Sequence, residues 1–214
     1  MRGLFVTFEG GEGSGKSTQI ERLAAHLRAE GLDPLATREP GGTPLGERVR
    51  DVLLDHELSP APLTEALLME AARAEIVARV IAPALEAGRI VLCDRYVHST
   101  LAYQGGGRGL DAALLEQLNR TATGGLAPDL VVLFDVPPEI GLERRERAGG
   151  SPNRLDRESP EFHRRVRERY LDLARREPDR FFVLDASLPP DDQERRIWDA
   201  VFPRVGTGRR PAGA

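Results

Sequence analysis

Eight residues near the N-terminus have the types and spacing needed to hold the phosphates of a nucleotide. They follow the pattern Gly-x-x-x-x-Gly-Lys-Ser, and they are Gly10, Gly11, Glu12, Gly13, Ser14, Gly15, Lys16 and Ser17, with Thr18 next. Glycines let backbone N–H groups converge on phosphate oxygens, and the helix expected after them adds its positive end. In such a loop the lysine bridges the β- and γ-phosphates, and the serine hydroxyl ligates Mg²⁺. The pattern predicts ATP binding, with magnesium as the cofactor.

The use of lysine in this chain supports that prediction. Lysine and arginine together total 30 residues, yet Lys16 is the sole lysine. A compact ammonium on a flexible stem suits a nest of backbone N–H groups better than a broad guanidinium does. Chance placement of one lysine is the alternative, and the surrounding motif argues against it.

Several protein classes share this loop, and the rest of the chain excludes some of them. The GTPase base-reading motif Asn-Lys-x-Asp is excluded because there is no second lysine. A transporter or motor ATPase would need a longer chain and an apolar strand ending in Asp-Glu, and this chain has neither. A small chain with an arginine-rich segment is typical of nucleotide and small-molecule kinases.

A second group of residues has the chemistry to hold the acceptor of a transferred phosphate. Asp94 and Arg95 end an apolar run, and Arg38 ends another. Two arginines at one sheet edge would suit bidentate capture of a second phosphate. Arg73 follows Met69 by four residues, so both point from one helix face, and a polar, glycine-rich run spans 99–109. The alternatives are a surface salt bridge, a solvated helix face and a plain loop.

Alternating strands and helices must position these groups. Apolar, β-rich runs predict strands at 4–8, 34–38, 90–94, 130–135 and 181–185. Helical patterns fit between or after them at 17–30, 63–87, 111–121, 139–147, 160–176 and 190–201, and a turn is expected at 39–44. This order predicts an α/β fold with a doubly wound, parallel five-stranded sheet and helices on both faces. The carboxyl ends of its strands form the edge where such folds bind ligands.

A small, polar segment at 148–153 is flanked by arginines at 144, 145, 147, 154 and 157. It is typical of a mobile flap, so we expect a short arginine-rich lid at about 142–157. The lid would belong to a single kinase domain over 1–205, followed by a disordered tail at 206–214.

The chain totals exclude some partners and compartments. A formal net charge of −4 argues against general nucleic-acid binding, which needs a basic surface. Cys93 is the only cysteine, so no internal disulfide can form, and a reducing cytoplasm is expected. We also expect no signal peptide, membrane span or membrane partner, because no long apolar run follows the N-terminus.

Four motifs in order resemble bacterial thymidylate (dTMP) kinase. They read FEGGEGSGKST, TREPGGT, DRY and AYQGGGRG, and the resemblance runs from about Phe5 to Trp198. The first motif is shared across a superfamily, whereas the others in this order are specific to the family. The resemblance implies transfer of the γ-phosphate of ATP to dTMP, giving dTDP and ADP for dTTP synthesis, and it implies a homodimer.

The resemblance also implies roles for residues on the dTMP side. Glu12 would accept a hydrogen bond from the deoxyribose 3′-hydroxyl, and Tyr103 would exclude a 2′-hydroxyl. The residues implied to hold the dTMP phosphate or contact the base are Arg38, Arg95, Arg73, Ser99, Thr100 and Gln104. Asp94 would hold Mg²⁺ through water. Met69 departs from the phenylalanine that usually stacks on thymine, and a thioether packs there with less directional stacking.

On the ATP side, the resemblance implies that the lid supplies a positive charge to the phosphates. Gly13 stands where eukaryotic-type enzymes carry a loop arginine, so the bacterial arrangement is expected. Arg144, Arg145, Arg147 and Arg154 all qualify by position. We expect Arg147 and Arg154 to be catalytic, together with Lys16 and Arg95, and Arg144 to bind ATP.

Three functions remain open at this point. The first is dTMP phosphorylation. The second is phosphorylation of a deoxynucleoside or of a different monophosphate, which Met69 leaves open. The third is a non-catalytic ATP-binding regulator, and the second arginine pair argues against it.

Overall fold

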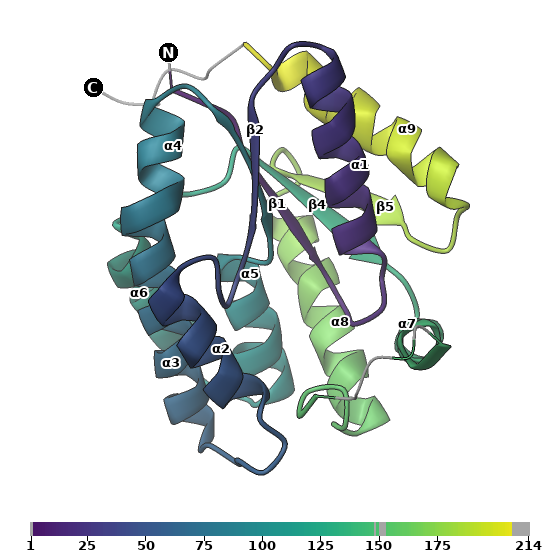
Figure 1. The fold of residues 1–214 in the computed structure, drawn as a ribbon. Coiled ribbons are helices and arrows are strands. Elements are labelled where there is room, and N and C mark those ends of the chain that lie inside the picture. Colours follow the sequence, from purple (N-terminus) through teal and green to yellow (C-terminus); the bar gives the residue numbers. More distant parts are fainter. Residues whose placement is uncertain (1, 148, 150–152, 207–214) are drawn as a thin grey trace.

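A five-stranded parallel sheet forms the centre of the protein, as seen in a computed structural model that describes residues 2–147, 149 and 153–206 (Figure 1). Its strand order is β2-β3-β1-β4-β5. The bounds are β1 (Phe5–Gly10), β2 (Pro34–Arg38), β3 (Ile90–Asp94), β4 (Leu130–Asp135) and β5 (Phe181–Asp185). The predicted doubly wound sheet is thus confirmed, and four of its strands have the predicted bounds.

Side chains alternate across the central strand and build a core on each face. Val6 and Phe8 of β1 join a cluster with α1 and α9 on one face, whereas Phe5 joins a second cluster on the other. The inner strands are almost fully buried, so both faces need apolar residues. Thr7 and Glu9 of β1 share the face of Phe5, so a buried carboxylate lies within the second face.

Helices cover both faces of this sheet. In Figure 1 α1 and α9 lie on one side, and α4 and α8 lie on the other. The α-helices are α1 (Lys16–Ala29), α2 (Pro44–Leu54), α3 (Pro62–Ile76), α4 (Ala82–Glu86), α5 (Val97–Thr100), α6 (Ala112–Thr123), α7 (Pro138–Arg147), α8 (Pro160–Arg176) and α9 (Pro190–Val201). Short π-helical or 3-10 turns are η1 (Val77–Ile81), η2 (Leu101–Gly107) and η3 (Phe202–Arg204). No helix among the described residues is both long and apolar enough to cross a membrane.

Two helical segments were not anticipated. The predicted turn at 39–44 leads into α2, which begins where Thr43 accepts a hydrogen bond from the Gly46 N–H and Pro44 fills the first turn. The glycine-rich run at 99–109 is mainly helical, in α5 and η2. Gly107 is required there because a Cβ would lie 2.4 Å from the Phe162 ring of α8. The alternative of a plain loop is therefore wrong.

The structure describes only part of the expected lid. Helix α7 runs to Arg147, and the chain is described again from Asn153 to the start of α8. The expected flap centre at 148–153 lies largely outside the described residues, as does the expected tail from 207 onward.

Candidate active site

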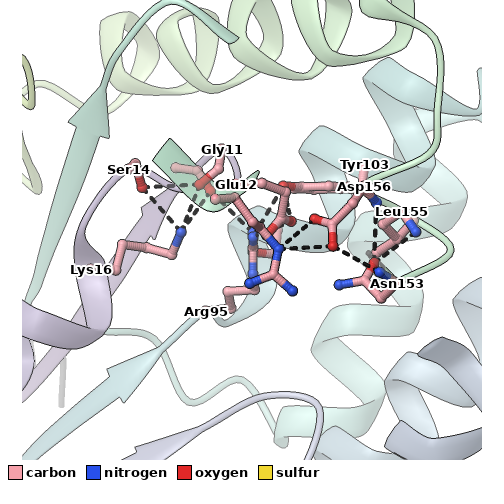
Figure 2. A network of polar contacts seen from close by, with 12 residues as sticks. Gly11, Glu12, Ser14, Lys16, Arg95, Tyr103, Asn153, Leu155 and Asp156 are labelled. Carbon is pink, nitrogen blue, oxygen red and sulfur yellow. Dashed lines mark hydrogen bonds and ion pairs between the residues drawn. The ribbon is translucent and has the colours of Figure 1, made fainter. Parts of the chain in front are cut away.

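The glycine loop joins β1 to α1 and encloses Lys16. The Lys16 Nζ donates to the carbonyl oxygens of Gly10 and Gly11, at 3.1 and 2.8 Å, and contacts Ser14 Oγ at 3.2 Å (Figure 2). Burial and the positive charge of Arg95 lower the pKa of Lys16 to about 8. The ammonium is thus held inside the glycine loop by two carbonyl oxygens and one hydroxyl.

Gly13 leaves no room for a side chain. A Cβ at this position would lie 1.8 Å from the carbonyl oxygen of Gly141 in α7, and the φ of Gly13 is 62°. The glycine loop and α7 therefore pack backbone to backbone. A loop arginine at position 13 would not fit, so positive charge near the phosphates has to come from other elements.

Ser17 and Asp94 form a pair suited to magnesium. The Ser17 hydroxyl donates to Asp94 Oδ2 at 2.9 Å, while Asp94 Oδ1 is buried and lacks a hydrogen-bond partner within the described part of the chain. Across those same residues, no cluster of three or more histidine, cysteine or acidic side chains is arranged to hold a metal. A serine hydroxyl with one carboxylate fits Mg²⁺, which keeps waters and takes its other oxygens from phosphates.

Arg95 lies between the glycine loop and the pocket beside it. It has a φ of 71° at the end of β3, a left-handed conformation that turns its side chain toward the loop. Its guanidinium donates to Glu12 Oε1 at 2.7 Å, to the Tyr103 hydroxyl at 3.1 Å and to the Gly10 carbonyl at 3.1 Å (Figure 2). It also lies 4.8 Å over the Tyr103 ring. Arg95 is therefore held as a fixed positive charge.

Glu12 is the counterion of this arginine. Burial alone would raise its pKa, but Arg95, Lys16 and the Tyr103 hydroxyl outweigh that effect and lower the pKa to about 2. The Tyr103 hydroxyl donates to Glu12 at 2.9 Å. The carboxylate is thus ionised at neutral pH and accepts hydrogen bonds at the mouth of the pocket.

Sequence reasoning missed Glu9, which organises this region from inside the sheet. Its carboxylate accepts from the Tyr96 N–H at 2.8 Å, from the Ser99 hydroxyl at 2.6 Å and from the Tyr170 hydroxyl at 3.0 Å. A glutamate within an apolar strand that enters a phosphate loop was the available signal. Glu9 fixes the start of α5 and therefore the wall from which Ser99 projects.

A cavity that encloses about 570 Å³, open solvent included, lies beside Glu12 and Arg95. The candidate residues Met69, Ser99, Tyr103 and Gln104 line it. Gln104 Oε1 is buried and has no hydrogen-bond partner among the described residues. The remaining lining residues are Glu39, Pro40, Arg50, Leu53, Leu54, Glu65, Asn153, Arg154 and Leu155.

Arg73 and Thr100, by contrast, lie beneath this cavity and are not among its described lining residues. The Arg73 guanidinium is fully buried and forms ion pairs with Glu39 at 2.8 Å and Glu70 at 2.5 Å. It also donates to Thr100 Oγ1, Asn119 Oδ1 and the Tyr96 carbonyl oxygen. In this conformation its donors are taken by protein acceptors, unlike the exposed donor that the resemblance implies.

A larger cavity, of about 1180 Å³, lies over the glycine loop. It shares Glu12, Glu39, Arg50, Arg95 and Asn153 with the first cavity, so the two are continuous. Arg38 lines only the larger one and pairs with Glu47 at 2.9 Å. Arg50 was missed by sequence reasoning because its helix, α2, was not predicted.

The lid arginines separate into two pairs. Arg144 and Arg145 line the larger cavity, and Arg145 Nε donates to both carboxylate oxygens of Asp156 at 2.8 Å (Figure 2 labels Asp156). Arg147 is 74% exposed and pairs with Glu143, whereas Arg154 pairs with Glu65 at 2.6 Å. Arg147 and Arg154, which we expected to be catalytic, thus each pair with a carboxylate in this structure, and neither lines the larger cavity.

The sheet, the glycine loop and the adjoining arginine-lined cavity define a P-loop kinase of the nucleoside monophosphate type. A sequence model described as thymidylate kinase matches residues 8–197. The chain therefore belongs to the thymidylate kinase family.

Individual relatives agree along nearly the whole chain. The thymidylate kinase of Deinococcus radiodurans is 56% identical over 203 residues, which cover 95% of this chain and 98% of the relative. That of Thermomicrobium roseum is 57% identical over 206 residues, covering 96% and 98%. The crystal structure of thymidylate kinase from Ehrlichia chaffeensis superposes with a TM-score of 0.76 at 33% identity, covering 94% of this chain and 99% of that one.

Proposed function

We propose that this chain transfers the γ-phosphate of ATP to dTMP, giving dTDP and ADP. The observation that carries the proposal is the placement of Arg95, which lines both cavities and contacts the glycine loop through the Gly10 carbonyl. One guanidinium can therefore reach the acceptor phosphate and the transferred group. Family membership supports the same activity.

Charge compensation and alignment are the protein's tasks in this reaction. The acceptor is an anionic phosphate oxygen, so its in-line attack on the γ-phosphate requires no strong general base. Lys16 and Arg95 supply fixed positive charge where negative charge spreads in the transition state. Mg²⁺, held by Ser17 and by Asp94 through water, would neutralise phosphate charge when bound. Lid closure over the cavity would exclude water and suppress ATP hydrolysis.

We assign the lid charge to Arg145 and Arg144 rather than to Arg147 and Arg154. Arg145 lies close enough to Glu12 to contribute to its low pKa, and both arginines line the cavity over the loop. The hydrogen bonds from Arg145 to Asp156 support this assignment, because they hold the side chain beside the cavity over the loop. No arginine fits at position 13 of the loop, so we propose that these two arginines of α7 supply the positive charge instead.

The side chains around the smaller cavity support binding of a deoxythymidine nucleotide. Gln104 Oε1 is an unpartnered buried acceptor, which suits the N3–H of thymine. Glu12 would receive the 3′-hydroxyl, and Tyr103 would stand against a 2′-hydroxyl. Arg38 and Arg50 would join Arg95 on the acceptor phosphate, and Met69 would pack on the base. Arg73 would support the pocket floor through its ion pairs with Glu39 and Glu70.

We also propose that the chain forms a homodimer. Apolar side chains are exposed on three neighbouring helices that Figure 1 shows together, α2, α3 and α6. They are Leu45, Val52, Leu63, Leu67 and Leu114. An exposed apolar patch on adjacent helices is typical of a protein interface. We propose that a second copy of the chain covers this patch, because in a two-fold symmetric dimer the same surface of each subunit contacts the other.

The proposed compartment is the cytoplasm. Cys93 is the sole cysteine of the chain, and it is buried as a free thiol. Such a chain draws no stability from disulfides and needs no oxidising environment. ATP and dTMP, the proposed substrates, are supplied in that compartment.

One assay tests the proposed function. ADP release is measured with ATP, Mg²⁺ and a panel containing dTMP, dUMP, dCMP, dGMP and thymidine. We expect dTMP to give the highest kcat/KM. Preference for another acceptor would contradict the thymidylate assignment, and ATP binding without ADP release would indicate a regulator.

A further inference from the structure

Glu65, on α3, accepts three hydrogen bonds and forms a further ion pair at the wall of the smaller cavity. It is 2% exposed. Its carboxylate accepts from Gln104 Nε2 at 2.7 Å and from Arg108 Nε and Nη2 at 3.3 and 3.1 Å. Arg154 Nη2 lies 2.6 Å away as an ion pair whose geometry is not that of a hydrogen bond. Two arginines therefore hold this carboxylate in place from either side.

The contact with Glu65 determines the orientation of the Gln104 amide. An ionised carboxylate has acceptors only, so the NH₂ group of Gln104 must face it. The carbonyl Oε1 is then directed away from Glu65, and it is buried without a partner in the described structure. The opposite amide orientation would set two oxygens 2.7 Å apart, at a residue that lines the smaller cavity.

Glu65 keeps its charge despite its burial. Burial raises its pKa, but hydrogen bonds from Arg108 and Gln104 and the charge of Arg154 outweigh this and lower the pKa. The carboxylate is therefore an obligatory acceptor across the neutral pH range. Glu65 therefore does not become protonated at neutral pH, and it cannot donate a hydrogen bond to the Gln104 carbonyl oxygen.

We propose that Glu65 is the positioning residue that makes the chain selective for a base carrying an N3–H, by holding the Gln104 carbonyl toward the cavity. Thymine and uracil offer a donor at N3, whereas cytosine offers an acceptor. With Oε1 directed at N3, thymine gains a hydrogen bond, while cytosine meets two facing acceptors. This inference rests on the proposed function, since it concerns how the same site selects its base.

Glu65→Gln tests the proposal, because it preserves the size of the side chain and removes the obligatory acceptor. Gln104 can then adopt either orientation. We expect the ratio of kcat/KM for dTMP over dCMP to fall about tenfold, the scale of one hydrogen bond, with most of the change in the KM for dTMP. Glu158→Gln is the matched control. Glu158 pairs with the same Arg108 at 2.5 Å but makes no hydrogen bond with Gln104 in the described part of the chain, so the ratio should stay within about twofold of wild type.

A double-mutant cycle separates positioning from general damage. In a Gln104→Ala background, Glu65→Gln should no longer change the dTMP/dCMP ratio, since the amide it orients is gone. The proposal is overturned if Glu65→Gln lowers the dTMP/dCMP ratio as much in the Gln104→Ala background as in the wild type. It is also overturned if the folded Glu65→Gln variant keeps the wild-type ratio. If Glu65→Gln does not fold, Glu65→Asp is measured in the same cycle, since it keeps the charge and withdraws from Gln104. Wild-type turnover of dTMP in this assay reports on the proposed function separately.

Discussion

Glu12 Oε1 and Arg95 Nη2 lie 2.7 Å apart and join the phosphate loop to the turn after β3. The two residues are separated by 83 positions in the chain, yet they form one charged unit. Arg95 holds Glu12 ionised, and Glu12 holds the guanidinium in place between the two cavities. The loop proposed to bind ATP is thereby connected to the proposed acceptor site.

Lys16 should titrate near neutral pH in the free protein. Its pKa is lowered to about 8, so the ammonium is present below that pH and lost above it. We expect kcat/KM for ATP to fall as pH rises through about 8. Because Lys16 is the sole lysine, isotope-labelled lysine gives a single side-chain NMR signal whose titration can be followed. A pH-independent kcat/KM up to about pH 9.5 would contradict this.

The variant Lys16→Ala should lose at least about 100-fold in kcat, because it removes this positive charge from the phosphate loop.

Asp94 should control the requirement for magnesium. Asp94→Asn removes the charge next to the Ser17 hydroxyl, so the Mg²⁺ concentration for half-maximal activity should rise about tenfold or more. Activity is measured against free Mg²⁺ at fixed ATP. Asp185→Asn, at the exposed end of β5, is the control strand-end aspartate. An equal shift in both variants would remove Asp94 from the metal site.

The four lid arginines should differ in their effect on turnover. Arg145→Ala and Arg144→Ala each remove positive charge from the cavity over the loop, and we expect at least about a tenfold loss of kcat, about 1.4 kcal/mol in barrier. Arg147→Ala is the control, because its side chain is exposed and pairs with Glu143. A larger loss in Arg147→Ala or Arg154→Ala would show that the lid presents different arginines during catalysis.

Tyr103 should contribute to the choice between deoxyribose and ribose. Tyr103→Ala opens space beside Glu12, so the preference for dTMP over its ribose counterpart should fall about tenfold. Tyr103→Phe keeps the ring and should retain most of the preference while losing the bond to Glu12. The ratio of kcat/KM on one sample is independent of the folded fraction. Unchanged discrimination in the alanine variant would remove the proposed role.

The apolar face of α2, α3 and α6 should hold two chains together. Leu67→Arg places a charge at the centre of α3, where the leucine is 49% exposed, and should convert a dimer to monomers. Light scattering after gel filtration measures the mass. Val183→Arg, at a similarly exposed residue of β5, is the control. A wild-type chain that is monomeric at all concentrations would refute the dimer.

The sequence by itself determined the sheet and the phosphate loop, because both depend on short-range patterns. The apolar run Ile90–Asp94 has the same bounds in the structure as in the prediction, since a strand buried on both faces needs consecutive apolar residues. Lys16 and Ser17 are similarly specified by their spacing from the glycines. The placement of Asp94 and Arg95 at the sheet edge followed from their position at a strand end.

Only the tertiary structure decided which charged residues meet. The partners of Arg145 and Arg154 depend on the rotational phase of α7 and on how the chain beyond the lid docks on α3, which no local pattern records. Glu9 reaches Ser99 across 90 positions, and Glu65 reaches Gln104 across 39. A buried carboxylate binds whichever donors the packing brings to it, so its role becomes visible only when distant segments are in place.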